Sequence, residues 1–134
     1  ASFAQHVDHL TSKVSRKIGA LRRTFRQMAA FARRQYLLSV IHPDFEYCFP
    51  VYASHLSAQS RERLFTLFRR AVRVTCGASY HAAVPPLLAS LQIKHLEYQY
   101  IYQFLTFTFI CHIVQPASCL RSLFPLPTSK RSTR

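Results

Sequence analysis

The chain has 134 residues, with 18 lysines and arginines against five aspartates and glutamates, for a formal net charge of +13. Its length fits one domain, and its 49% hydrophobic content is enough to build one contiguous core. An all-β fold is disfavoured, because such folds use many glycines at turns and bulges and this chain has only two.

The first predicted helix runs from about Phe3 to Met28. Apolar side chains recur there at steps of three and four residues and fall on one stripe, namely Phe3, Val7, Leu10, Val14, Ile18, Leu21, Phe25 and Met28. The pattern predicts one packed face, with lysines and arginines around the rest of the helix. Gly19 lies inside the pattern, and a break or a close contact with another helix is an alternative there.

A second helix is predicted over residues 29–41. It is expected to end by His42, because a residue that precedes proline is displaced from the α region. Pro43 can then begin a short helix at its first position, extending to about Tyr52. Pro50 should kink or shorten this helix.

The clearest amphipathic pattern lies between Arg61 and Val74. Hydroxyls at Ser57 and Ser60 can cap the start of this helix, and Gly77 is expected to stop it. The predicted buried stripe consists of Leu64, Leu67, Phe68, Ala71 and Val72, and the predicted outer face of Glu62, Thr66, Arg69, Arg70 and Arg73.

Two more helices follow. Pro85 and Pro86 begin a short helix that ends near Leu91, and a long apolar helix is predicted over residues 94–114, before Pro116. Residues 98–114 carry no charge, which is the lower edge of membrane-spanning length, so a transmembrane helix is an alternative to a central core helix. Polar side chains within it favour the core helix.

The sequence therefore predicts an all-α fold, a compact bundle of about five to six helices. The helical domain is expected to span residues 1–124. Residues 125–134 are rich in proline, serine, threonine and basic side chains, and they are predicted to form a disordered basic tail.

The cysteines form no standard metal-binding pattern. Cys48, Cys76, Cys111 and Cys119 include no CxxC pair, and the spacing of His112 to Cys119 matches no standard zinc site. Reduced, buried thiols and the lack of a secretory signal predict an intracellular, reducing location, in the nucleus or cytoplasm, with an organelle as an alternative. We expect no catalytic residue, no metal site and no cofactor.

The positive charge indicates the kind of partner. Positive side chains in such excess repel one another, so a polyanion that releases counterions on binding is the favoured partner. Nucleic acid is the first candidate. An anionic membrane is the second candidate and is disfavoured, and a solvated basic surface without a ligand is a third possibility.

Three motifs follow one another along the chain. The first is KIGAL at Lys17–Leu21, continued by a helical run to VIHPDFEYC at Val40–Cys48. The second is LFRRAVRVTCG at Leu67–Gly77, and the third is VPPLLASLQI at Val84–Ile93 with the helix after it. Together, over residues 2–124, they resemble the region that follows the catalytic palm in non-LTR (LINE-type) retrotransposon reverse transcriptases.

The family patterns are a lysine-containing helix followed by v-x-P-x-l-e-Y-c, then l-q-R-R-A-v-R-x-i-x-G, then l-L-x-x-L-x-i. Tyr52 departs from them, since the family commonly has tryptophan there. The resemblance implies a helical thumb region, which in the family packs beside the primer–template duplex. Such a thumb holds an A-like duplex or hybrid by its backbone, without reading sequence.

The resemblance does not extend to polymerase chemistry. That chemistry needs clustered aspartates for two divalent ions, whereas the acids of this chain are scattered at Asp8, Asp44, Glu46, Glu62 and Glu97. The expectation is a non-catalytic, sequence-independent nucleic-acid-binding fragment of an RNA-directed DNA polymerase family.

The expected nucleic-acid-binding residues are cations on the first and fourth predicted helices, namely Lys13, Arg16, Lys17, Arg23, Arg26, Arg69, Arg70 and Arg73. Most aromatic side chains are expected in the core, whereas Tyr80, Tyr98 and Tyr100 are freer to reach a ligand. The alternative function is a retrotransposon-derived structural or interaction protein, whose apolar surface is buried against other protein subunits of a larger assembly.

Overall fold

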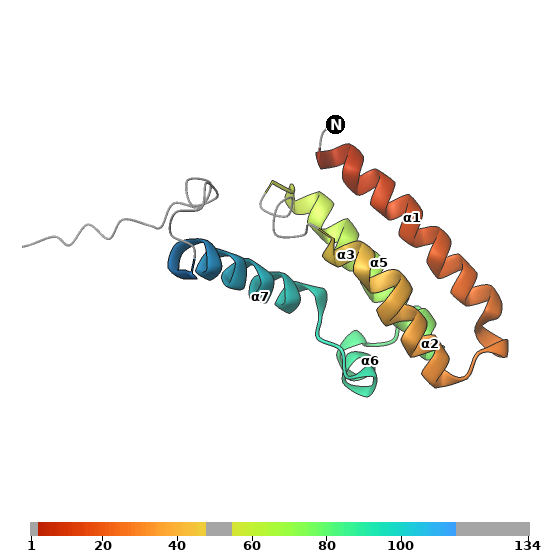
Figure 1. Cartoon of the computed structure of the whole chain (residues 1–134). Coiled ribbons are helices and arrows are strands. Elements are labelled where there is room, and N and C mark those ends of the chain that lie inside the picture. The colour runs from red at the N-terminus through yellow and green to blue at the C-terminus, as the bar shows by residue number, and fades with distance from the viewer. Residues whose placement is uncertain (1–2, 48–54, 115–134) are drawn as a thin grey trace, which may run out of the picture. The chain divides into compact units, whose positions relative to one another are not determined.

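The computed structural model describes residues 3–47 and 55–114. Contacts divide the chain into one unit of residues 1–100 and a second of residues 101–134. The described residues form helices joined by turns, with no strand among them, which confirms the all-α prediction (Figure 1). The expected domain boundary at residues 124 and 125 lies outside the described residues.

Six α-helices lie in the described parts of the chain, as the bundle prediction requires. They are α1 (Phe3–Thr24), α2 (Ala30–Tyr36), α3 (His42–Glu46), α5 (Ala58–Cys76), α6 (Val84–Leu91) and α7 (Leu96–Phe109). A 3-10 turn at Phe25–Gln27 follows α1, and π-helical segments at Leu37–Ile41 and Ile110–Val114 follow α2 and α7.

The apolar stripe of α1 faces the core as predicted. Val7, Leu10, Val14, Ile18 and Leu21 are all buried, and α1 packs chiefly against α5. Helix α1 passes through Gly19 without a break. A Cβ atom at that position would meet only the Nη1 atom of Arg23, at 3.8 Å, so the alternative of a break or close helix contact is wrong.

A new helix, α3, begins at the predicted boundary and carries Pro43 in its first turn, but His42 is not displaced from the α region. His42 has φ −59° and ψ −41°, inside the α region, and it is the first residue of α3. Its N–H donates to the carbonyl of Leu37, five residues back, so the π-helical segment shifts the hydrogen-bond register before the proline. We attribute the accommodation of Pro43 to this wider turn. The Pro50 kink lies outside the described residues.

Helix α5 is the central element of the first unit. Ser57 is its N-cap, and its Oγ atom accepts a hydrogen bond from the N–H of Ser60 at 3.1 Å. The five residues of the predicted stripe are all buried, together with Phe65 and Thr75. Gly77 ends the helix in the left-handed conformation, at φ 67°, as predicted.

Helix α7 runs from the first unit into the second, and the prediction of a central core helix stays a prediction. Of the residues of α7 only Leu96 is buried, while Tyr98, Tyr102 and Leu105 are more than 60% exposed. Apolar side chains are distributed around this helix rather than on one stripe, so a single packing face cannot cover them. No described helix combines the length and the apolar character needed to cross a membrane.

Candidate functional site

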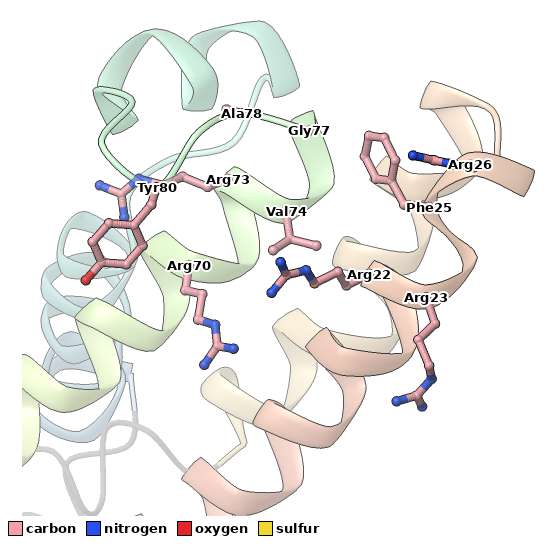
Figure 2. A pocket seen from close by; sticks show the side chains of 10 residues that line it. All are labelled: Arg22, Arg23, Phe25, Arg26, Arg70, Arg73, Val74, Gly77, Ala78 and Tyr80. Carbon is pink, nitrogen blue, oxygen red and sulfur yellow. The ribbon is translucent and has the colours of Figure 1, made fainter.

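Five arginines line one cleft in the unit of residues 1–100. They are Arg22, Arg23, Arg26, Arg70 and Arg73, and the wall is completed by Phe25, Val74, Gly77, Ala78 and Tyr80 (Figure 2). The cleft has a volume of about 610 Å³. This volume lies in the usual range of ligand sites, roughly 300–1,000 Å³.

Two helices that are distant in sequence supply these arginines. Arg22 and Arg23 lie in the last turn of α1, and Arg26 lies in the 3-10 turn that follows. Arg70 and Arg73 lie three residues apart on α5, and therefore on neighbouring positions of one face. In Figure 2, Arg22 extends from α1 and Arg70 from α5 into the space between the two helices.

A close contact between Phe25 and Gly77 joins the two ends of the cleft wall. A Cβ atom at Gly77 would lie 2.4 Å from the Cζ atom of Phe25, so only glycine permits this approach. The guanidinium of Arg33 covers the Phe25 ring, with its Cζ atom 3.9 Å from the ring centroid. Phe25 therefore holds the end of α1 against the end of α5.

The turn that follows α5 is fixed to the helix by Arg73. The Nε atom of Arg73 donates to the carbonyl of Ala82 at 3.0 Å, and its guanidinium carbon lies 5.9 Å from the centroid of the Tyr80 ring. The backbone carbonyl of Arg73 accepts from the N–H of Ala78 at 2.9 Å. Tyr80 is thereby positioned at the cleft, with 76% of its surface exposed.

No acidic side chain lines the arginine cleft. Among the described residues, none of its arginines forms an ion pair with a carboxylate. The carboxyl ends of α1 and α5 lie nearby, but each helix end supplies only about half a negative elementary charge. The two ends together offset about one of the five positive charges, so the cleft retains a strong attraction for an anion.

Three other predicted binding residues, Lys13, Lys17 and Arg69, lie outside the cleft and have acidic partners. Lys13 and Lys17 both pair with Asp44 of α3, and the Lys17 ammonium also donates to the carbonyl of Val40 at 2.7 Å. Burial of the Asp44 carboxyl raises its pKa, but the hydrogen bonds and charges of Lys17 and Lys13 outweigh this effect and leave the pKa below its ordinary value. These lysines therefore stabilise the packing of α1 on α3.

Arg69 also has a partner. Its Nη1 atom lies 2.8 Å from the Oε1 atom of Glu62 on the outer face of α5, and Arg63 pairs likewise with Asp8 at 3.0 Å. Arg16 is exposed on α1 but does not line the cleft. The structure thus brings together four of the eight predicted residues, Arg23, Arg26, Arg70 and Arg73.

Arg22 is the cleft residue that the sequence analysis missed. Its spacing from Arg26 carried a usable signal, because residues four apart on a helix lie on the same side. Tyr80, in contrast, was expected to be free to reach a ligand, and it lines the cleft.

No group of three histidine, cysteine, aspartate or glutamate side chains that can hold a metal ion occurs in the described ranges. Cys76 and Cys111 are free thiols, and burial raises the pKa of Cys76. Cys48 and Cys119 lie outside the described residues.

Comparison with protein-family models, curated proteins and solved structures finds no match to this chain.

Proposed function

We propose that the chain binds nucleic acid through its phosphate backbone, without sequence preference, and that the arginine cleft is the centre of the interface. The observation that carries the proposal is a cleft lined by five arginines without carboxylate partners among the described residues, three from the end of α1 and the turn after it and two from α5. Guanidinium groups donate two parallel hydrogen bonds to phosphate oxygens, and such contacts fix a strand without reading its bases.

The geometry allows contact from two sides. A strand that enters between α1 and α5 meets Arg22 from one helix and Arg70 from the other (Figure 2). Both residues are exposed, so they can adjust to successive phosphates. This arrangement suits a non-catalytic thumb-like fragment of a non-LTR retrotransposon reverse transcriptase, which would hold a duplex or hybrid by its backbone.

Paired substitutions test whether the cleft or the net charge is responsible. The variant Arg22→Gln with Arg70→Gln removes two cleft charges, and the control Arg63→Gln with Arg69→Gln removes two charges that are paired with Asp8 and Glu62. Each hydrogen bond to a charged group makes a net contribution of about 1.5–3 kcal/mol to the binding free energy. The cleft variant should therefore bind an RNA–DNA hybrid at least roughly tenfold more weakly than the parent chain.

The control variant should bind within about twofold of the parent chain, since exposed ion pairs contribute little. Filter binding at fixed salt measures both affinities, and circular dichroism checks that both variants remain helical. Equal weakening in the two variants would show that binding follows net charge alone, and the cleft proposal would then be wrong.

A second candidate function rests on the second unit. Its apolar side chains Tyr102, Leu105 and Phe109 are 70%, 61% and 57% exposed, which favours burial against other protein subunits. On this alternative, the isolated chain should self-associate in sedimentation velocity experiments, and Leu105→Lys should suppress the association. A monomer at all concentrations, with or without the substitution, would argue against it.

A further inference from the structure

The arginine cleft combines positive charge with an exposed aromatic ring, Tyr80. Its volume of about 610 Å³ accommodates a short run of sugar, phosphate and base. A site of this volume can hold a nucleotide of a single strand, or of an unpaired end that leaves a duplex.

Tyr80 is the aromatic side chain at this cleft that is available to a ligand. Phe25 also lines the cleft, but its ring lies beneath the Arg33 guanidinium and against Gly77. Tyr80 is 76% exposed, and its ring packs edge-on with that of His81, at 5.2 Å between centroids. An exposed aromatic ring beside a positive groove is the combination by which proteins stack unpaired bases.

The position of Tyr80 is fixed before any ligand arrives. It lies in the turn closed by the hydrogen bond from the N–H of Ala82 to the carbonyl of Ser79, and Arg73 holds the same turn through Ala82. A base stacked on Tyr80 would place its own phosphate beside Arg73 and Arg70, which line the same cleft (Figure 2). Little ordering of the protein would then be needed on binding.

We propose that Tyr80 stacks on one unpaired base and makes the cleft a site for single-stranded nucleic acid, including the unpaired end of a duplex. The inference rests on the proposed function, because the arginines must hold the phosphates. It adds a preference that backbone contacts alone do not provide, since phosphates are present in duplex and single strand alike.

Three probes of matched sequence separate base stacking by Tyr80 from backbone binding by the arginines. The first is a blunt RNA–DNA hybrid, the second is the same hybrid with an unpaired overhang, and the third carries an abasic overhang that keeps the phosphates and lacks the bases. Fluorescence anisotropy measures each affinity. The parent chain should bind the base-bearing overhang about fivefold or more tighter than the abasic one, as expected for one stacked base.

Tyr80→Ala should remove this preference, so that the base-bearing and abasic overhangs bind equally, whereas Tyr80→Phe should retain it. Tyr98→Ala is the matched control, because Tyr98 is 68% exposed and does not line the cleft. If Tyr80→Ala keeps the parent preference, or if the parent shows none, the stacking inference is wrong while the backbone proposal stands. If the parent chain binds none of the three probes, both are wrong.

Discussion

Gly77 is constrained twice, by its backbone and by its neighbour. Its φ of 67° disfavours any side chain, and a Cβ atom would overlap the Phe25 ring. We expect Gly77→Ala to lower the free energy of unfolding by about 1–3 kcal/mol, as is usual for strain combined with overpacking. Urea denaturation followed by circular dichroism measures the change.

Gly19→Ala is the matched control for this prediction. The added methyl group would meet only the flexible end of Arg23, inside an unbroken helix. It should raise the free energy of unfolding by about 0.5–1 kcal/mol, because alanine favours helix more than glycine does. Similar effects of the two substitutions would contradict the proposed contact between Phe25 and Gly77.

Asp44 links the stability of the first unit to pH. Its side chain is only 10% exposed and accepts from both Lys13 and Lys17, and its pKa lies below the ordinary value. A carboxyl whose pKa is lowered on folding stabilises the protein fully above its unfolded pKa, near 4, and this contribution is lost as pH falls through the folded pKa.

Asp44→Asn should therefore lower the free energy of unfolding at neutral pH, by about 1.5–3 kcal/mol for the loss of a charge-assisted network. It should also flatten the decline of stability below about pH 4. Denaturation series at neutral and acidic pH measure both effects. A variant that matches the parent at neutral pH would show that the Lys13, Lys17 and Asp44 network is not stabilising.

The N-cap of α5 gives a prediction for a whole element. Ser57→Ala removes the acceptor of the Ser60 N–H and should lower the free energy of unfolding by about 1 kcal/mol. Ser57→Asp supplies another acceptor and should retain most of the parent's stability. Thermal unfolding of the three proteins makes the comparison. If Ser57→Ala unfolds at the same temperature as the parent protein, the cap at the first turn of α5 contributes little to stability.

Helix α5 was well predicted because its signals are local. The stripe, the capping serine and Gly77 all act within a few residues of the chain. The backbone conformation of His42 was wrongly predicted. The π-helical segment before Pro43 changes the hydrogen-bond register, and no residue pattern next to the proline indicates such a segment.

The candidate site could be predicted only in part. Arg23, Arg26, Arg70 and Arg73 were identified as outward-facing cations, but their meeting at one cleft depends on how α1 packs on α5. The pairing of Lys17 with Asp44 joins residues 27 apart in the chain, and no local pattern reveals it. Distinguishing arginines free to bind a ligand from cations already paired therefore required the structure.

At the scale of the whole molecule, the charge distribution determines the behaviour in salt. The net charge of +13 alone predicts attraction to any polyanion, but the number of phosphates neutralised depends on the cations that reach the ligand together. If each of the five cleft arginines contacts one phosphate, binding neutralises five phosphates.

The salt dependence of duplex binding tests the central claim most directly. With five phosphates neutralised, the logarithm of the binding constant should fall against the logarithm of salt concentration with a slope of about −4 to −5. The slope should become shallower by about 2 in the Arg22→Gln, Arg70→Gln variant and stay unchanged in the Arg63→Gln, Arg69→Gln control. A parent slope near zero, or the same slope in all three proteins, would contradict the proposal that the arginine cleft holds the nucleic-acid backbone.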